Sequence, residues 1–365
     1  VSTHTKNLQA QLFDKDIPQL SKALDIKINA VIYKGRHNYI CRTRLENLIN
    51  NHAHLISPNE YEALMTLMVW EWETKTGDIS ECVGFQLNRF KRLWSLVRSE
   101  RGYCSTHRCS RYEGCYLGGL RNRMKDVDII IVNHSLFVNE LQSENTTLPD
   151  NFIYVVDEAH HFANDIRSQL VQEFGIQTLN DVFKYFDQDK KNGKILSFKK
   201  YPVLYKVYKE IAGDSEIIRN ELLDFFNSYY SNRYQDIRES GYYIDKHLYN
   251  NIEQEFIDTS PNIWEILNSL NQFEIKIQKL SDIMIKYKDQ ISQSILIEFD
   301  MIKDCLEDGI STLKSVLDSS NDVVKWSSFI KKESHTQVIL NSAPLKVNRF
   351  IYDHLLNCHS GGFFC

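Results

Sequence analysis

The sequence is poor in the features that mark several classes of protein. Its 365 residues include only 14 glycines and 6 prolines, while 42% are hydrophobic and 25% are charged. This composition excludes a collagen-like, low-complexity or largely disordered chain. The longest strongly apolar runs, such as Phe152–Val156, span about five residues, whereas a membrane-spanning helix needs about 20.

The N-terminus also lacks a basic start followed by an apolar stretch, so it shows no secretory signal. A chain of this length has room for two or three domains, because one domain usually takes about 100–200 residues. We therefore expect a globular protein in the cytosol or a nucleus, with no membrane-spanning helix.

Charge is unevenly distributed along the chain. The net charge of −5 conceals 19 Lys and Arg against 14 Asp and Glu in residues 1–139, and 24 against 34 in the remainder. The segment Gly84–Lys125 alone carries ten basic and two acidic residues. Such a local excess favours contact with a polyanion, most simply a nucleic acid. A solvated basic face is the alternative.

Three of the eight cysteines lie close together, at Cys104, Cys109 and Cys115. The segment around them contains Gly and Ser and indicates a loop, in which thiolates can converge on one metal centre without helical geometry. Three ligands leave a tetrahedral zinc site or a cubane cluster one ligand short. Three residues are candidates for the fourth ligand: Cys41, Cys82 and His107. Structural zinc and inert buried thiols are the alternatives.

Hydrophobic periodicity predicts an alternation of strands and helices. We expect strands at residues 26–33, 126–133, 151–156 and 336–340, and helices at residues 40–53, 59–76, 85–97 and 346–356. Short apolar strands that alternate with helices indicate a parallel sheet buried on both faces. Between residues 163 and 322, apolar and charged residues recur at helical spacing with little Gly or Pro, which predicts a helical domain.

The helix predicted at residues 59–76 has both a start signal and a buried face. Ser57 precedes Pro58 and stands three residues before Glu60, which is the pattern of a capping box. Four apolar residues recur at helical spacing and should therefore pack in the core: Leu64, Leu67, Met68 and Trp72.

The most specific local motif is FIYVVDEAHH, at residues 152–161. An apolar strand that ends in adjacent carboxylates would place Asp157 and Glu158 at the carboxyl edge of a parallel sheet, where α/β folds bind their ligands. Phosphoryl transfer needs such a pair, because one carboxylate holds Mg²⁺ on the nucleotide and a second group activates the attacking water. A chance match of a short motif is the alternative. His160 and His161 are adjacent and do not share a helical face, so we do not expect a metal pair.

Six motifs follow one another along the chain. They are VSTHT (1–5), VIYKGRHNYIC (31–41), TKTGDISE (74–81), the cysteine triplet, VNHSLF (132–137) and VVDEAHH (155–161). This order resembles the DinG/XPD family of iron–sulfur helicases within superfamily two. The bacterial DinG-like branch fits best, because both the TKTGD segment and the cysteine spacings match it. The resemblance extends to about residue 357.

The resemblance implies specific roles for the motif residues. It implies a 4Fe–4S cluster without Cys82 and His107, bound by Cys41, Cys104, Cys109 and Cys115. It also implies that Asp157 binds Mg²⁺ through water and that Glu158 activates the attacking water in ATP hydrolysis. Seven residues would line the DNA path or the coupling region: Thr3, His4, Thr5, Lys34, Arg36, Asn133 and His134.

Aromatic residues within the basic segment are candidates for base stacking. They are Tyr103, Tyr112, Tyr116, Phe85 and Trp94. For Phe85 and Trp94 we expect packing within a helix rather than contact with bases.

The implied fold class is α/β, with an incomplete RecA-like motor domain of parallel strands, an iron–sulfur insert and an all-helical Arch insert. The motor domain would comprise residues 1–33, 126–162 and 323–357. The iron–sulfur domain would span residues 34–125 and the Arch domain residues 163–322. Residues 358–365 form an atypical tail that matches no motif of the family.

The implied function is that of an ATP-dependent 5′-to-3′ DNA helicase, a monomer of the bacterial cytoplasm that acts on single-stranded, forked or R-loop DNA. The sequence contains no phosphate-binding loop of the type G-x-x-x-x-G-K-[ST]. In this family that loop precedes the VSTHT strand, so we expect an inactive fragment that also lacks the second motor domain. The alternative is a non-catalytic nucleic-acid-binding module that carries the cluster or zinc.

Overall fold

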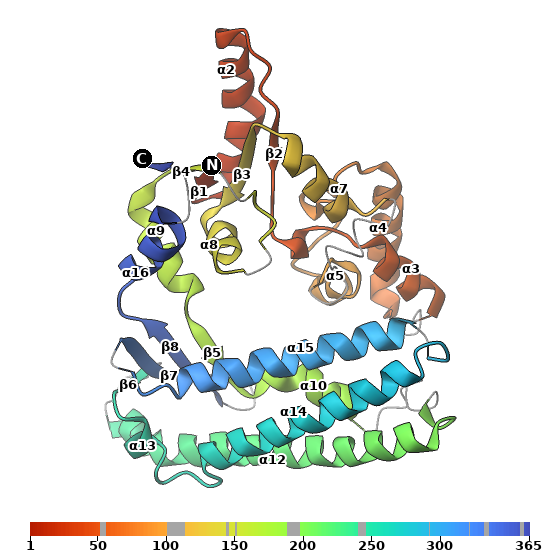
Figure 1. Cartoon of the computed structure of the whole chain (residues 1–365), viewed down its shortest axis with the longest axis vertical. Helices are drawn as coiled ribbons and strands as arrows, with labels where there is room; N and C mark the ends of the chain where they lie inside the picture. Colours follow the sequence, from red (N-terminus) through yellow and green to blue (C-terminus); the bar gives the residue numbers. More distant parts are fainter. Residues whose placement is uncertain are drawn as a thin grey trace. The chain divides into compact units, whose positions relative to one another are not determined.

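The computed structural model describes the chain apart from residues 52–55, 101–113, 144–145, 150–151, 188–197, 240–245, 292, 321, 332–335 and 358–360. The chain folds as two compact units, shown as ribbons in Figure 1. The first unit contains Val1–Gln169 and Val347–Cys365, and the second contains Leu170–Lys346. None of the helices in the described part is both long and apolar enough to cross a membrane.

A five-stranded parallel sheet forms the centre of the first unit. Its strand order is β2–β3–β1–β4–β9, and each pair of neighbours is parallel. Consecutive residues of a strand point to opposite faces, and both Ile131 and Val132 of β3 are buried, so this part of the sheet is covered on both faces. The strands are β1 (Ser2–Thr3), β2 (Ala30–Ile32), β3 (Ile129–Asn133), β4 (Ile153–Val156) and β9 (Gly361–Phe364). Strands β3 and β4 confirm the two strands predicted from the apolar runs.

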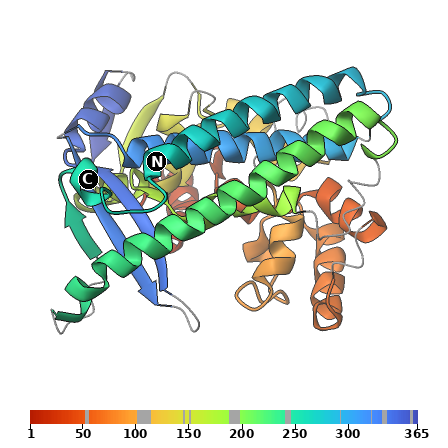
Figure 2. The ribbon, with the colours of Figure 1, turned by 90° about the horizontal axis from the view of Figure 1, so that it is seen from below.

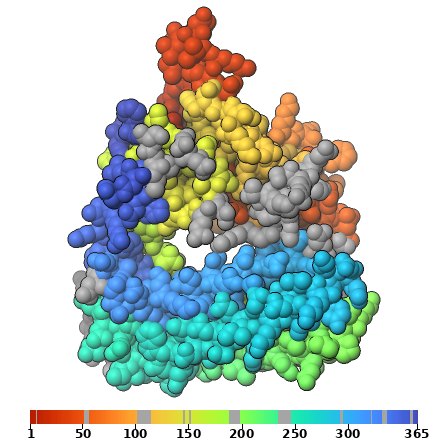
Figure 3. Space-filling model, viewed as in Figure 1, coloured from red at the N-terminus to blue at the C-terminus, as the bar shows by residue number. Residues whose placement is uncertain are grey.

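Helical segments connect the strands of this sheet. They are α1 (Lys6–Gln11), η1 (Leu12–Asp16), α2 (Ile17–Leu24), α8 (His134–Gln142), α9 (Ala159–Gln169), α16 (Asn348–Ile351) and η8 (Tyr352–Leu356). Helix α2 stands out from the rest of the first unit (Figure 3), and its Leu20 and Leu24 are exposed. The helix ends where Asp25 adopts a left-handed conformation with a φ of 50°. Because the chain turns there, the strand predicted at residues 26–33 is shorter and begins only at Ala30.

The described residues of the chain between β2 and β3 form short helices, and we call this part of the chain the insert. Its elements are η2 (Arg36–Asn38), α3 (Arg42–Asn51), η4 (Pro58–Glu60), α4 (Tyr61–Glu73), η5 (Ile79–Glu81), α5 (Lys91–Val97), α7 (Tyr116–Arg123) and η6 (Met124–Asp126). The predicted capping box is present, because the Ser57 N–H donates to Glu60 Oε2 at 2.9 Å. Leu67, Leu93 and Val97 are fully buried in a core that belongs to the insert.

Two predictions about this insert were partly wrong. Trp72 is 89% exposed, because it lies five residues after the buried Leu67 and therefore about 140° around the helix. The predicted helix at residues 85–97 begins only at Lys91. Trp94 packs from this helix as expected, and Phe85 is buried in the same core although it lies outside the helix.

The second unit combines long helices with an antiparallel sheet. Its helical segments are η7 (Ile176–Leu179), α10 (Asn180–Phe186), α12 (Pro202–Glu239), α13 (Ile252–Glu255), α14 (Ile263–Lys286) and α15 (Gln293–Val316). Figure 2 shows α12 and α14 side by side, and α14 also contacts α15. Helix α14 buries apolar residues at intervals of three and four, as an amphipathic helix does: Ile263, Ile266, Leu270, Phe273 and Ile277.

The second unit also contains an antiparallel sheet, and two of its strands lie within residues 163–322, which were predicted to be all-helical. Its strand order is β5–β8–β7–β6, with β5 (Gln172–Phe174), β6 (Lys246–Tyr249), β7 (Val323–Lys331) and β8 (Thr336–Pro344). The strand predicted at residues 336–340 is therefore present, but it pairs with β7 and β5 rather than with the parallel sheet. These strands bury Lys325, Ser327 and Asn341, and such polar residues weaken the strand pattern in the sequence. The second unit ends at Lys346, and the chain continues in the first unit from Val347.

The last residues of the chain add a strand to the parallel sheet. Strand β9 pairs with β4 in parallel, from Ile153 opposite Gly361 to Val156 opposite Phe364. A Cβ atom on Gly362 would lie 1.9 Å from Cε2 of Tyr154, so only glycine fits beside this ring. The tail that matched no family motif therefore has a defined place beside β4.

Candidate functional site

The two carboxylates of the DEAH motif lie at the carboxyl end of β4. The strand ends at Val156 and α9 begins at Ala159, so Asp157 and Glu158 form the whole connection. The Asp157 N–H donates to the Ser2 carbonyl at 2.9 Å and extends the pairing of β4 with β1. The Glu158 N–H donates to Asp157 Oδ1 at 3.1 Å. Both residues are half-buried, and neither carboxylate forms an ion pair with another described residue.

Glu158 adopts an unusual backbone conformation. Its φ is 50°, and among the described residues other than glycine only Asp25 shares a positive φ. A left-handed conformation costs a residue with a Cβ atom about 1–2 kcal/mol. Such strain persists only where the surrounding structure holds it, and it is concentrated at functional sites. The conformation of Glu158 therefore marks this turn as a candidate site.

The buried residue His134, which directly follows β3, contacts the same turn. His134 is 1% exposed. Its Nδ1 lies 2.6 Å from the Ser2 hydroxyl oxygen, and its Nε2 lies 3.0 Å from the Asp157 carbonyl oxygen. The ring also makes an edge contact with Phe162 of α9, with centroids 5.1 Å apart. Burial lowers the pKa of His134, although the nearby Asp165 and the Asp157 carbonyl oppose this shift.

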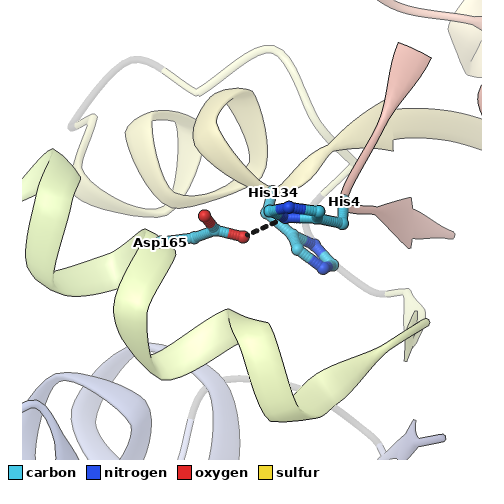
Figure 4. A group of neighbouring side chains, drawn as sticks. All are labelled: His4, His134 and Asp165. Atoms are coloured by element: carbon cyan, nitrogen blue, oxygen red, sulfur yellow. Dashed lines mark hydrogen bonds and ion pairs between the residues drawn. The ribbon is translucent and has the colours of Figure 1, made fainter.

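His4 lies beside this histidine at the end of β1. Its Nδ1 is 3.0 Å from Asp165 Oδ2 on α9, as the dashed line in Figure 4 shows. Its ring stacks on His161, with centroids 4.6 Å apart. The side chain is 36% exposed, so His4 has one face in contact with protein and another toward solvent. This pair connects the VSTHT segment to the helix that follows the DEAH motif.

His4, His134 and Asp165 offer donor atoms that all lie within 4.8 Å of one another, which is a spacing that a metal ion could draw together. Both ring nitrogens of His134 already have partners, however. A metal bound to His134 would therefore cost one of these buried hydrogen bonds. We assign the group to hydrogen bonding and do not treat it as a metal centre.

Two of the four predicted cluster cysteines lie in the described part of the insert. The Cys41 N–H donates to the Val97 carbonyl at 2.8 Å. Cys115 caps the N-terminus of α7, and its sulfur accepts the Gly118 N–H at 3.4 Å. Cys82 is 6% exposed in the apolar core, where burial raises the pKa of its thiol. The other candidates, Cys104, Cys109 and His107, lie outside the described residues.

The residues that directly follow Cys41 and Cys115 contact each other. Nη2 of Arg42 donates to the Tyr116 hydroxyl at 2.7 Å, and the guanidinium also pairs with Glu71. The Tyr116 hydroxyl lies 2.9 Å from Glu71 Oε1 and 2.8 Å from the Glu71 carbonyl. Gly77, with a φ of 69°, lies so close to the Tyr116 ring that a Cβ there would be 2.4 Å from Cγ. We call the trio Arg42, Glu71 and Tyr116 the cysteine clamp.

The seven residues predicted near DNA fall into two groups. Thr3, Asn133, His134 and Lys34 have local partners: Thr3 is fully buried, Asn133 caps α8, and Lys34 donates to Asp78 at 2.5 Å and to Ser80 at 2.9 Å. The other three are exposed or half-buried: His4, Thr5 and Arg36. Thr5 also caps α1 by accepting the Leu8 N–H. His4 and Thr5 are exposed, whereas Arg36, Lys34 and Asn133 are half-buried.

The described basic residues of the segment Gly84–Lys125 are only partly neutralised. Arg92 pairs with Glu60, and Arg98 pairs with Glu100. Four others are exposed and form no ion pair with a described residue: Arg89, Lys91, Arg123 and Lys125. Tyr103 and Tyr112 lie outside the described residues, and Tyr116 belongs to the cysteine clamp.

Sequence reasoning missed three residues that hold this site together. Ser2 forms a hydrogen bond with His134, and Asp165 forms one with His4. Glu71 forms a hydrogen bond with Tyr116 in the cysteine clamp. Asp165 lies four residues after His161 on α9, a spacing that places both on one helical face, so this partner had a signal in the sequence. Glu71 had none, because a single buried glutamate in an apolar helix has no distinctive pattern.

No protein-family model matches the chain. Over 173 residues, or 46% of the chain, it is 34% identical to the ATP-dependent DNA helicase YoaA of Escherichia coli, of which 27% is covered. Over 199 residues, or 49% of the chain, it is 31% identical to the ATP-dependent helicase DinG of Mycobacterium tuberculosis, of which 29% is covered. The chain is a partial homologue of the DinG and YoaA helicases.

The resemblance to the DinG-like family, expected from the motifs, is thereby confirmed for about half of the chain. The 3′-5′ exonuclease DinG of Bacillus subtilis is 30% identical over 168 residues, which are 44% of this chain and 17% of that protein. The chain thus spans less than a third of the length of these relatives. Two solved structures named XPD helicase and truncated XPD align with TM-scores of 0.38 and 0.39, at 11% and 12% identity, over all of this chain and over 49% and 79% of theirs.

Proposed function

We propose that the chain supplies one half of the nucleotide site of an ATP-dependent DNA helicase, together with an iron–sulfur insert. The observation that carries this proposal is the turn after β4, where Asp157 and the left-handed Glu158 stand at the carboxyl end of a parallel sheet. Ligands of open α/β sheets bind at this end of the strands. The relation to DinG and YoaA supports the choice of ATP and DNA over other ligands.

The carboxylates fit the roles that phosphoryl transfer requires. In the proposal Asp157 holds Mg²⁺ through water, and carboxylate oxygens without an ion-pair partner among the described residues suit this hard cation. Mg²⁺, when bound, would neutralise charge on the nucleotide phosphates. Glu158 orients the attacking water and accepts its proton. The connection between β4 and α9 has only two residues, and the strained backbone of Glu158 holds its carboxylate at this turn.

The insert fits a 4Fe–4S cluster held by Cys41, Cys104, Cys109 and Cys115. Thiolates are the ligands of such clusters, and the cysteine clamp fastens the segments that carry Cys41 and Cys115 to each other. Cys82 is a poor ligand because its thiol is buried among apolar side chains. A zinc ion on the same thiolates is the alternative.

DNA contact is proposed for the accessible residues of the first unit. His4 and Thr5 lie at the end of β1, Arg36 lies at the start of the insert, and the exposed basic residues lie further along the insert. Single-stranded, forked or R-loop DNA and 5′-to-3′ unwinding are proposed for the longer protein in which such a chain would act, a monomer of the bacterial cytoplasm.

The cluster is tested by iron and sulfide analysis of the chain purified without oxygen, together with its visible absorption spectrum. We expect four iron and four sulfide per chain, by analogy with cubane clusters of about that composition. Cys41→Ser and Cys115→Ser should lose the colour, whereas the matched variant Cys82→Ser should keep it. Colourless, iron-free protein that contains zinc would favour the alternative module, and protein without either metal would refute both.

DNA binding is tested by fluorescence anisotropy with a labelled single strand at several salt concentrations. If about six phosphates are neutralised, affinity should fall about 10³-fold between 50 and 200 mM salt. Charge-removing variants of Lys91 and Lys125 should flatten this dependence, whereas Lys206, on α12 of the second unit, provides a control. An affinity that does not change with salt would contradict the basic surface.

A measurement of ATP hydrolysis distinguishes the helicase proposal from the alternative, a non-catalytic nucleic-acid-binding module. The sequence of residues 1–365 contains no glycine-rich phosphate loop, so we expect no DNA-stimulated ATP hydrolysis by this chain. In a longer protein that includes such a loop, Glu158→Gln should abolish hydrolysis while nucleotide binding persists. Unchanged hydrolysis by that variant would refute the role of Glu158.

A further inference from the structure

His134, which was expected to line the DNA path or the coupling region, is enclosed by other residues of the chain. The residue is 1% exposed, and both of its ring nitrogens are occupied by protein atoms. One partner is Ser2 on β1, and the other is Asp157 at the end of β4. His134 itself directly follows β3. His134 and Asp157 thus directly follow β3 and β4, and Ser2 lies on β1 between these two strands, opposite Val132 and Val156.

The chemistry of the partners fixes which ring nitrogen carries the proton. A backbone carbonyl oxygen only accepts hydrogen bonds, so Nε2, at 3.0 Å from the Asp157 oxygen, must be the protonated nitrogen. In a neutral ring Nδ1 is then an acceptor, and the Ser2 hydroxyl donates to it over 2.6 Å. The Ser2 hydroxyl can donate or accept a hydrogen bond, whereas the Asp157 carbonyl can only accept one. The Asp157 carbonyl therefore sets the tautomer of His134.

The histidine closes a ring of hydrogen bonds around the peptide of Asp157. The Asp157 N–H donates to the Ser2 carbonyl at 2.9 Å, while the Asp157 carbonyl accepts from His134. Ser2 and Asp157 are thus joined twice, once directly and once through the imidazole. The carbonyl that His134 holds belongs to the peptide immediately before Glu158, whose φ is 50°. Holding this carbonyl fixes one end of the strained residue.

We propose that His134 is a positioning residue, which holds the Asp157–Glu158 turn in place as an Nε2-protonated imidazole between Ser2 and the Asp157 carbonyl. The proposal rests on the proposed function only for the catalytic role of the Asp157–Glu158 turn. The bridge itself can be measured without nucleotide, DNA or iron, so its failure is distinguishable from failure of that function. Contact of Phe162 with the ring adds a packing restraint on the same side as α9.

The first measurement is the tautomer, read by NMR from the ring nitrogens of ¹⁵N-histidine-labelled chain. We expect one histidine with a protonated Nε2 and a hydrogen-bonded, unprotonated Nδ1. Ser2→Ala should shift the Nδ1 resonance of this histidine alone, which assigns it to His134 and tests the Ser2 bond. A protonated Nδ1, or no effect of Ser2→Ala on any ring, would overturn the proposal.

The second measurement is hydrogen exchange of the Asp157 and Glu158 amides. His134→Phe keeps a ring but loses both hydrogen bonds, and exchange of these amides should become about tenfold faster. His134→Gln should restore slow exchange, because its amide can donate to Asp157 and accept from Ser2. His247→Phe, the same change at a half-buried site on β6 of the second unit, should leave these amides unaffected.

Equal exchange in His134→Phe and His134→Gln would show that the ring acts by packing alone and would overturn the proposal. If His134→Phe does not fold, the comparison of His134→Gln and Ser2→Ala with the unmodified chain decides. Ser2→Ala should speed exchange by a smaller factor than loss of the whole bridge, since the Asp157 bond remains. Slow exchange in every folded variant would also refute the bridge.

Discussion

The Arg42 guanidinium lies 4.6 Å from the centroid of the Tyr116 ring and donates to the Tyr116 hydroxyl at 2.7 Å. These two residues directly follow Cys41 and Cys115, and they are 74 positions apart in the sequence. Two cysteine-bearing segments are therefore joined by side chains, independently of any inorganic group. Burial and Glu71 raise the pKa of Tyr116 to about 12, so its hydroxyl remains protonated at neutral pH.

Tyr116→Phe should weaken the insert. It removes a hydroxyl that serves both Arg42 and Glu71, and we expect the free energy of unfolding to fall by about 1–2 kcal/mol. Urea unfolding of the chain measures this loss. Tyr61→Phe, at a position that is 51% exposed on α4, should leave the free energy unchanged and serves as the control. If both variants unfold alike, the clamp contributes nothing to stability.

A second prediction concerns pH and the capping box of η4, which leads into α4. Burial by itself would raise the pKa of Glu60, but hydrogen bonds from Arg92 and the Ser57 N–H outweigh it and lower the pKa. A carboxylate with a lowered pKa stabilises the folded state above its unfolded value of about 4.5. That stabilisation is lost as the pH falls through the lower folded value.

Glu60→Gln should therefore cost about 1 kcal/mol of unfolding free energy at pH 7. The difference from the unmodified chain should shrink once the pH falls below about 4.5. Unfolding curves between pH 7 and pH 3 measure it. Glu62→Gln, at an exposed position of the same helix, should show no such dependence. A difference that is constant over this range would contradict the ionic part of the cap.

A third prediction concerns the strain at Glu158. Glycine adopts a positive φ without cost, although it loses more entropy on folding, so Glu158→Gly should raise the free energy of unfolding by up to about 1 kcal/mol. Asp25→Gly, at the other non-glycine residue with a φ of 50°, provides a positive control. In a longer, hydrolytically active protein the same Glu158 variant should be inactive. A loss of more than about 1 kcal/mol would show that the Glu158 side chain stabilises the turn.

A fourth prediction separates the two faces of α4. Trp72 is 89% exposed, so Trp72→Gln should change the free energy of unfolding by less than about 0.5 kcal/mol. Leu67 is fully buried, and Leu67→Ala should cost about 2–5 kcal/mol. Thermal and urea unfolding give both values. A large cost at Trp72 would mean that the indole is covered in solution.

The sequence predicted those elements that are determined by residues close to one another in the chain. The apolar runs predicted β3 and β4, and the spacing of Ser57 and Glu60 predicted the capping box of η4, directly before α4. Trp72 was assigned to the core by periodicity alone, although the buried face of α4 is narrower than the apolar pattern. Strand β7 went unnoticed because it buries Lys325 and Ser327 among its apolar residues.

The candidate site was predictable to the same extent. The carboxylates stand at a strand end, which an apolar run followed by Asp157 and Glu158 indicates directly. Their supports come from elsewhere in the chain: Ser2 is 132 residues from His134, and His4 is 161 residues from Asp165. Pairings over such distances depend on strand order, which no local pattern specifies. Family resemblance assigned His134 to the DNA path or the coupling region, and no local pattern indicated that this residue is only 1% exposed.

The connection between β4 and α9 is only two residues long. Adding a single residue there would rotate the start of α9 by about 100° about its axis. Asp165 would turn away from His4, and Phe162 would leave the His134 ring. The length of this two-residue connection is therefore as constrained as its sequence. Homologous chains should tolerate substitutions on α9 far better than insertions before this helix.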